Sequence, residues 1–511
     1  MVKQSSNWPG VPGLSALFIT ICLALSSRAQ ILLSTDFETN PMTQGWTTNG
    51  LGAAYWTTNQ SFSGLHSIAA ATNGTWISPM LNTTPLQWYR LSFKSLAPAA
   101  VNNPGAIGYA YWAAQFFDAN SNLLTEDQYS SVFQSAGWVT NEFRLRAKNT
   151  GTNGILYPVK MQIRFQAISP LVYIDDVTLT ATTPAEVAQW GDAYYDTLPA
   201  KLAYVPKADR WRYLTNTLNR LRTGQNLRIV MLGDSVEQDT ANAPFDAWLQ
   251  RLYPGATVQV ISSTRGGTGL SYFVTNLADW VLAYRPDLLC VGGIDNPDDM
   301  TVYESVVHQV RQDNVLNGYT TEFLMLTEQW SPNVQGGLFS FITSDLTELD
   351  QVPANNPGGV PSGFRGDLLK FCATNNLEYL DLTGVACQFI YGPANTAGVG
   401  PPANPNGDPY SYWMRDYTHS SDHGKMIQGR MLEAFFAPAP TLSVQRTGGG
   451  SASLAWPLAA TGYHLETAPA LAKVMSWSSN TTTFVITNGQ NVSSATVNSR
   501  TQQLYFRLNR P

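Results

Sequence analysis

The chain has 511 residues, of which 44% are hydrophobic and 13% charged, and its formal net charge is −6 at pH 7. This mildly acidic balance offers no basic patch for nucleic acid or for an anionic membrane surface. The length exceeds what one hydrophobic core supports, and at roughly 100–200 residues per domain we expect about three domains.

Residues 1–29 have the features of a secretory signal peptide. A weak positive start at Lys3 precedes a short apolar core over residues 14–25, and Ser27 and Ala29 supply small residues for cleavage. The apolar core is too short to span a bilayer, and no stop-transfer pattern follows it. We therefore expect cleavage near Ala29 and a secreted or periplasmic protein without a membrane span.

The cysteines do not indicate a disulfide-stabilised protein. Of the four, Cys22 lies in the signal peptide, which leaves Cys290, Cys372 and Cys387. Three cysteines do not make a disulfide framework. Cys372 and Cys387 could pair, whereas Cys290 lies in an apolar run that predicts a buried strand and an unreactive thiol.

Residues 30–183 have the pattern of an all-β sandwich. Polar and apolar side chains alternate over residues 88–93 and 159–165, and an Asn-Asn-Pro-Gly turn occupies residues 102–105. Short alternating strands separated by turn clusters are typical of β-sandwiches.

Two stretches of this segment resemble the jelly rolls of carbohydrate-binding modules: Asp-Phe-Glu at 36–38 and Tyr-Ile-Asp-Asp at 173–176. The resemblance implies a structural calcium ion held by Asp36, Glu38 and Asp176, whose carboxylates are hard oxygen ligands. Solvated acids at strand ends would give the same pattern. The resemblance also implies that exposed tryptophan rings stack on sugars, although each candidate taken alone is more typical of a core residue: Trp46, Trp56 and Trp112.

Residues 184–224 look like a linker, with a lead-in helix over 211–222, and residues 225–437 have an α/β pattern. The apolar run before Gly-Asp-Ser at 233–235 predicts a buried strand, and a helical pattern begins at Pro244. Further strands near 322–326 and 377–382 alternate with helical stretches, which predicts a doubly wound parallel sheet. Ser235 would then follow the carboxyl end of a strand, where such sheets carry their active sites. A serine at a strand–helix junction is also a common helix cap.

The search for a base is short, because the chain has five histidines. His419 ends the tetrapeptide Asp416-Tyr417-Thr418-His419, and Gly424 follows five residues later. A serine hydroxyl becomes a nucleophile when an imidazole takes its proton, and a carboxylate fixes the imidazole tautomer. A separate expectation concerns the long insert over residues 330–361, which we expect to form one side of the substrate cleft.

Gly-Asp-Ser, a glycine-rich turn at 265–269 and Asp-x-x-His, in this order, resemble the SGNH (GDSL) hydrolases. The resemblance implies a flavodoxin-like sheet and a catalytic Ser235, His419 and Asp416. It also implies an oxyanion hole formed by the backbone N–H groups of Ser235 and Gly269 and the side chain of Asn296. The usual Gly-x-Asn-Asp block departs here, because Asn296 follows the glycines one position late. The chemistry requires no cofactor.

After Pro438-Ala439-Pro440, residues 438–511 contain short alternating strands, such as 504–508, that resemble the small immunoglobulin-like modules of secreted proteins. The fold class is therefore multidomain: an N-terminal β-sandwich (jelly roll), a central α/β doubly wound parallel sheet and a small C-terminal β-sandwich.

Together these features predict a secreted serine esterase that removes acetyl or other short acyl groups from polysaccharide. A lipase or thioesterase would use the same residues but would need an apolar acyl channel. A non-catalytic glycan-binding adhesive protein would explain the modular layout and the irregular asparagine block. As a targeting module, the sandwich should fold alone, and its removal should spare the hydrolysis of small esters.

Overall fold

The computed structural model describes residues 30–49, 54–98, 110–132, 135–147, 157–167, 171–202, 204, 206, 210–293, 299–327, 364–391, 413, 419–438, 442–448, 451–457, 464–468, 478–479, 485–487, 490–496 and 505–509. The predicted signal peptide, the turn at 102–105, the insert at 330–361, Asp416 and Asn296 lie outside these residues. In the described chain, no helix combines the length and the hydropathy needed to cross a membrane.

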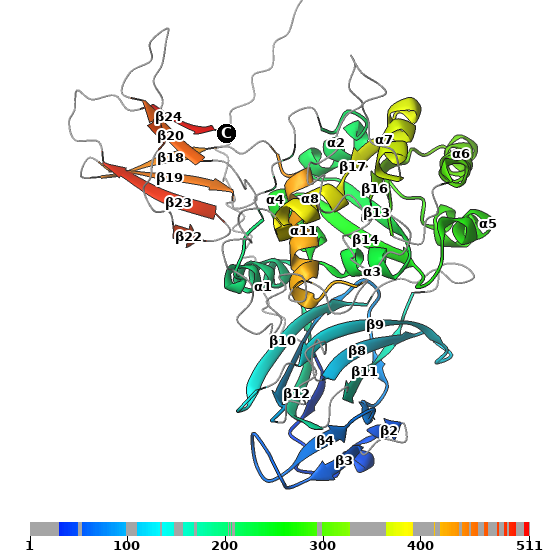
Figure 1. Cartoon of the computed structure of the whole chain (residues 1–511), viewed down its shortest axis with the longest axis vertical. Helices are drawn as coiled ribbons and strands as arrows, with labels where there is room; N and C mark the ends of the chain where they lie inside the picture. The colour runs from blue at the N-terminus through cyan, green and yellow to red at the C-terminus, as the bar shows by residue number, and fades with distance from the viewer. Residues whose placement is uncertain are drawn as a thin grey trace, which may run out of the picture.

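The N-terminal part consists of antiparallel strands in two sheets (Figure 1). One sheet has the order β10-β7-β12-β4-β3, with β1 paired to β12, and contains β1 (Ile31–Thr35), β3 (Ala54–Thr57), β4 (Ser67–Ala71), β7 (Trp88–Leu96), β10 (Val139–Arg146) and β12 (Leu171–Thr182). The other has the order β2-β5-β11-β8-β9, with β6 paired to β11, and contains β2 (Thr47–Asn49), β5 (Thr75–Ile77), β6 (Leu81–Asn82), β8 (Ala110–Phe117), β9 (Leu123–Val132) and β11 (Lys160–Ala167).

Strand β11 shows why the sequence forms a sandwich. Its side chains alternate without a break between buried and half-buried, so that Ile163 and Phe165 face the core while Arg164 and Gln166 face outward. This period of two buries one face of each sheet against the other.

The three candidate sugar-stacking tryptophans are not exposed platforms. Trp46 and Trp112 are 1% and 0% exposed and belong to the sandwich core. Trp56 is half-buried, stacks on His66, and donates its indole N–H to the carbonyl of Phe37 at 2.8 Å. Sequence periodicity does not separate a large core ring from an exposed one, because tryptophan suits both positions.

A parallel five-stranded sheet forms the centre of the α/β part, with the order β14-β13-β15-β16-β17. This is the order 2-1-3-4-5 of doubly wound folds. Its strands are β13 (Asn226–Gly233), β14 (Thr257–Thr264), β15 (Leu288–Val291), β16 (Glu322–Leu326) and β17 (Glu378–Leu380). Its helices are α1 (Pro184–Thr197), α2 (Thr215–Thr223), α3 (Ser235–Asn242), α4 (Phe245–Leu252), α5 (Leu270–Trp280), α6 (Met300–Asn317), α7 (Phe364–Asn375), α8 (Leu382–Tyr391) and α11 (Asp422–Phe436).

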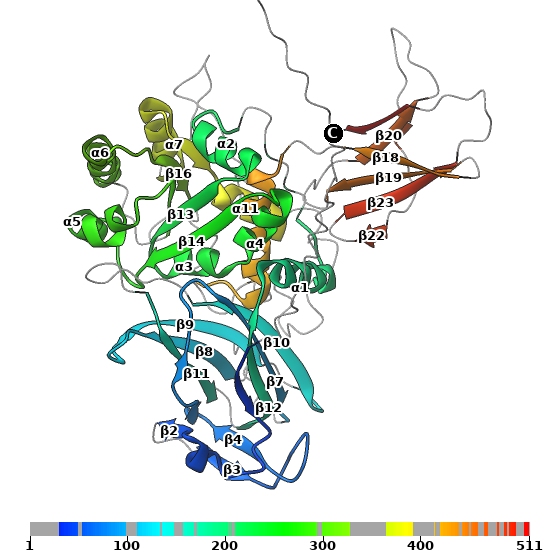
Figure 2. The same ribbon diagram turned by 180° about the vertical axis from the view of Figure 1, so that it is seen from behind.

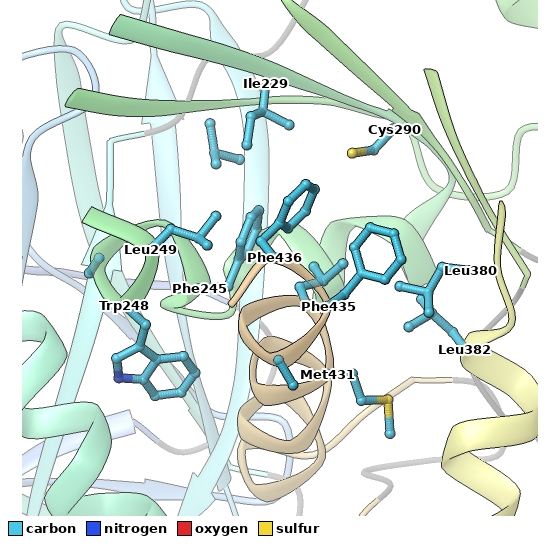
Figure 3. Packing of buried hydrophobic residues seen from close by; sticks show 14 of the residues in the cluster. Ile229, Phe245, Trp248, Leu249, Cys290, Leu380, Leu382, Met431, Phe435 and Phe436 are labelled. Carbon is cyan, nitrogen blue, oxygen red and sulfur yellow. The ribbon is translucent and has the colours of Figure 1, made fainter. Parts of the chain in front are cut away.

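Alternation along β13 builds two cores, one on each face of this sheet. Ile229 and Met231 pack among residues of α4 and α11, and Figure 3 shows side chains of this cluster, including Ile229, Trp248 and Phe436. Val230 and Leu232 belong to the cluster that contains α5, α6 and α7. A strand covered on both faces is expected to be apolar throughout, as this one is.

The segment predicted as a linker, residues 184–224, begins with a helix. Residues 184–197 form helix α1, which begins with a capping box between Thr183 and Glu186. Gly191 of α1 faces the Trp248 ring closely, since a Cβ at Gly191 would lie 2.6 Å from that ring. The lead-in helix α2 starts at Thr215 rather than near 211, because Trp211 has φ +73° and donates its backbone N–H to Glu378 at 3.1 Å.

The C-terminal part has two small antiparallel sheets, with orders β18-β19-β23-β22 and β21-β20-β24. Leu454, Trp456 and Leu465 form its described core. Its strands are β18 (Ser443–Gly448), β19 (Ser451–Pro457), β20 (His464–Ala468), β21 (Ser478–Ser479), β22 (Val485–Thr487), β23 (Gln490–Thr496) and β24 (Tyr505–Asn509). Its likeness to immunoglobulin modules stays a prediction.

The N-terminal sandwich packs directly against the α/β part, and both views place β9 and β10 beside it (Figures 1 and 2). Arg146 of β10 forms an ion pair with Asp246 of α4, and both side chains are buried. Arg146 also donates to the carbonyl of Ala241 at 2.9 Å and lies over the Trp88 ring. A buried charge pair at this junction means that the two parts share an interior.

Candidate active site

Strand β13 delivers Ser235 to the first position of helix α3. Asp234 is the N-cap residue, and its carboxylate accepts the backbone N–H of Val236 at 2.8 Å and that of Glu237 at 3.3 Å. Because the first N–H groups of a helix have no intrahelical acceptor, this end carries a partial positive charge. The hydroxyl of Ser235 therefore lies where developing negative charge is favoured.

Glycines let the strand ends approach the nucleophile turn. A Cβ on Gly233 would lie 2.2 Å from the carbonyl oxygen of Gly292, so β13 and the turn after β15 meet in van der Waals contact. Gly293 has φ +105°, and a Cβ there would lie 2.6 Å from a carboxylate oxygen of Asp234. The glycines of both turns are thus required by close packing around Asp234 and Ser235.

His419 lies beside the nucleophile. Its Nε2 atom is 2.9 Å from Oγ of Ser235, a hydrogen-bonding distance across 184 residues of sequence. Both side chains are half-buried, which leaves them accessible to a substrate. This is the contact that the proton transfer from a serine nucleophile to an imidazole requires.

The loop that carries His419 is held by Asp239, four residues after the nucleophile on α3. The Asp239 carboxylate accepts the backbone N–H of Ser420 at 2.9 Å and lies 3.6 Å from Nζ of Lys425. The glycine of the histidine motif, Gly424, leaves no room for a side chain, because a Cβ there would lie 2.1 Å from the carbonyl oxygen of Trp413. The sequence motifs that predict the site do not include Asp239.

Of the predicted site residues, the structure brings Ser235 and His419 together. Asp416 and Asn296 lie outside the described residues, so their roles stay predictions. Gly269 is the N-cap residue of α5, and its part in an oxyanion hole also stays a prediction. In the same turn, Gly266 lies close to the nucleophile, since a Cβ there would be 3.5 Å from Cβ of Ser235.

Glu237 is a buried carboxyl group directly behind the nucleophile turn. It is 2% exposed, and burial, followed by the nearby negative charge of Asp234, raises its pKa well above the usual range. One of its oxygens would lie 2.4 Å from a Cβ at Gly292, so the carboxyl group fills the space beneath the glycine turn. The sequence gives no signal for this residue, because a glutamate in the first helical turn usually faces solvent.

Ser235 and His419 open into a pocket of about 220 Å³. Among the described residues, the other side chains that line it are all polar: Glu126 and Gln128 from strand β9 of the sandwich, and Gln238, Asp239 and Asn242 from α3. These described walls therefore offer hydrogen-bond donors and acceptors around the nucleophile.

The described cysteines take no part in this site. Cys290 is buried in β15, and burial raises the pKa of its thiol, as expected of an unreactive cysteine. Cys372 is a buried free thiol, so the possible bridge to Cys387 is not formed. Cys372 packs in the apolar cluster on one face of the parallel sheet, where a reduced cysteine behaves as a small hydrophobic residue.

The three predicted calcium ligands are not gathered into one group of potential metal ligands among the described residues. Glu38 accepts the backbone N–H groups of Leu65 and His66 at 2.8 and 2.7 Å, which lowers its pKa. Asp176 accepts the hydroxyl of Ser63, and no group of three potential metal ligands occurs among the described residues. The carboxylates of Glu38 and Asp176 thus hold the loop before β4, and calcium binding stays a prediction.

Comparison with models of protein families and with curated proteins found no match. Among solved structures, the chain is similar to the CBM22-1 xylan-binding domain of Paenibacillus barcinonensis Xyn10C, at 15% identity over 30% of this chain and 95% of that one, with a TM-score of 0.23. It is also similar to a two-domain esterase (CEX) active on acetylated mannans, at 13% identity over 58% of this chain and 90% of that one, with a TM-score of 0.31. Likenesses at these identities and TM-scores support no conclusion about function, which has to come from the site itself.

Proposed function

We propose that the protein is a secreted serine ester hydrolase of the SGNH type that removes acetyl groups from polysaccharide. The observation that carries the proposal is the 2.9 Å contact between Nε2 of His419 and Oγ of Ser235, at the amino end of α3 and the carboxyl edge of a parallel sheet. A nucleophile and its base within hydrogen-bonding distance, at the edge where such sheets carry active sites, are the parts that acyl transfer needs.

In the proposed mechanism, Oγ of Ser235 attacks the ester carbonyl while Nε2 of His419 takes the hydroxyl proton. Asp416 orients the imidazole and stabilises its protonated form. The backbone N–H groups of Ser235 and Gly269, with the side chain of Asn296, receive the oxyanion. His419 then returns the proton to the leaving alcohol, and a water molecule repeats the sequence on the acyl-enzyme.

The pocket supports a small acyl group and a hydroxyl-rich alcohol. Its walls carry amide and carboxylate side chains, Gln128, Gln238 and Asn242 among them, which pair with sugar hydroxyls and not with a long acyl chain. This lining favours acetylated polysaccharide over the substrates of a lipase or thioesterase.

The test is a substrate panel on purified enzyme, which compares 4-nitrophenyl acetate, 4-nitrophenyl esters of longer acids and acetylated polysaccharides. We expect the rate to fall as the acyl chain lengthens, and we expect release of acetate from polysaccharide. Ser235→Ala should lose activity by several powers of ten while keeping its fold. A folded Ser235→Ala variant with wild-type turnover would contradict the proposal, and inactivity of the wild type on every ester would favour the adhesive protein.

A further inference from the structure

Strand β9 brings two side chains of the sandwich to the nucleophile. Glu126 and Gln128 line the same pocket as Ser235 and His419. They stand two residues apart on β9 and therefore share its outward face, whereas Tyr129 on the other face stacks on Trp112 of the sandwich core.

The position of β9 against the α/β part is fixed by several contacts. Gln238 of α3 donates to the carboxylate of Asp127 and to the carbonyl of Glu126, the latter at 3.4 Å. Lys425 of α11 donates to the carbonyl of Gln128 at 3.1 Å, and its ammonium group lies 4.3 Å from the centre of the Tyr129 ring. The carbonyl groups of Glu126 and Gln128, on this edge strand, thus accept hydrogen bonds from α3 and α11, which holds this wall of the pocket in place.

Glu126 itself is held by a row of polar side chains on the outer face of the sheet. Its carboxylate pairs with Arg164 and accepts from Gln115 at 2.8 Å and from Gln128 at 3.1 Å. Arg164 in turn donates to Gln166 at 2.7 Å. Glu126 and Arg164 are only 20% and 17% exposed, so the row is an ordered, partly desolvated surface.

The chemistry of this wall suits a neutral, hydroxyl-rich ligand. The charges of Glu126 and Arg164 cancel locally, so the surface attracts neither an acidic nor a basic partner. The remaining groups are carboxamides, which both donate to and accept from hydroxyl groups. Because the groups are already ordered by one another, a bound sugar would meet them with little loss of side-chain entropy.

We propose that Glu126 and Gln128 are specificity residues of the hydrolase, which hold the sugar that carries the ester over Ser235, and that Arg164 positions Glu126. The sandwich then completes the active site rather than serving as a separable tether. The inference rests on the proposed function for the identity of the reaction, while its binding part can be measured without turnover.

The kinetic test compares Glu126→Gln and Gln128→Ala with a matched control, Glu142→Gln, which alters an arginine-paired glutamate on the other sheet of the sandwich. The substrates are acetylated xylan and mannan oligosaccharides, with 4-nitrophenyl acetate as the ester that has no sugar. For whichever oligosaccharide the wild type hydrolyses with the higher kcat/KM, each pocket variant should raise KM about tenfold with little change in kcat. A tenfold change is the usual loss of affinity when one hydrogen bond to a charged or buried partner is removed. The control should behave as wild type.

The binding test uses the Ser235→Ala enzyme with the same oligosaccharides in titration calorimetry. Adding Glu126→Gln or Gln128→Ala to this enzyme should raise the Kd for the oligosaccharide by a similar factor, whereas adding Glu142→Gln should leave it unchanged. Pocket variants that bind and turn over oligosaccharides as the control does would overturn the inference. A wild type that hydrolyses no ester would overturn the proposed function, yet loss of glycan binding in the pocket variants would still support the binding role.

Discussion

The buried ion pair between Arg146 of the sandwich and Asp246 of the α/β part should contribute strongly to stability. The side chains of Arg146 and Asp246 are 3% and 5% exposed, so removing one partner leaves the other as an uncompensated buried charge. Such a loss costs about 3–5 kcal/mol. Asp246→Asn should fall near the lower end, because Arg146 keeps its hydrogen bond to the carbonyl of Ala241. Arg146→Met should cost more, because it also loses that bond and the contact with the Trp88 ring.

The assay is urea unfolding followed by tryptophan fluorescence and, in parallel, by residual hydrolysis of 4-nitrophenyl acetate. The double variant Arg146→Met/Asp246→Asn should be less destabilised than the sum of the two single variants, with a coupling of about 2 kcal/mol. Arg90→Met is the control, since Arg90 is 49% exposed in its pair with Glu142 and surface pairs contribute about 0–1 kcal/mol. If Asp246→Asn shifts the transition no more than Arg90→Met does, the two parts are not joined through this pair, and the tethered-module interpretation stands.

Substitutions at three further positions test the surroundings of the nucleophile. Glu237 has a pKa raised by burial and by Asp234, so the stability that its protonated form contributes is complete below the unfolded-state pKa and is lost as pH rises toward the folded-state value. Above about pH 4.5, the unfolding free energy of the wild type should therefore fall with pH by up to about 1.4 kcal/mol per pH unit more than that of Glu237→Gln. Equal slopes for the two proteins in pH-dependent urea titrations would refute this. Asp239→Ala should lower kcat and destabilise the fold by about 1–3 kcal/mol, because it leaves Ser420 and Lys425 without this carboxylate. Asp239→Asn keeps an acceptor for the backbone N–H of Ser420 and should therefore lose less activity and stability. Equal losses in the two variants would argue against the positioning role of Asp239. Asn296→Ala should lower kcat by about 10²–10³ with little change in KM, and an unchanged kcat would move the oxyanion role elsewhere.

Part of this architecture follows from the sequence because it depends on local pattern. The apolar run at residues 229–232 predicts a strand buried on both faces, and the two clusters around Ile229 and Val230 fulfil that prediction. The pairing of Ser235 with His419 follows from two short motifs, since each motif fixes where one side chain stands relative to a strand end or a helix start.

The rest depends on tertiary contacts that leave no periodic signal. Glu126 lies on the outward face of its strand, as a solvated residue would. Only the packing of β9 against α3 and α11 brings it to the pocket. Spacing alone does not tell which glycine of the 265–269 turn meets the nucleophile. That is set by the path of the turn, which begins with the backbone N–H of Arg265 donating to the carbonyl of Gly233 at 3.0 Å.

The most direct test of the central claim is to trap the nucleophile. Treatment with diethyl 4-nitrophenyl phosphate followed by peptide mass spectrometry should give one diethylphosphoryl adduct, on Ser235, in step with the loss of esterase activity. His419→Ala should label far more slowly, because its serine lacks the base 2.9 Å away. An adduct on another residue, or full activity in enzyme that is fully labelled on Ser235, would contradict the account.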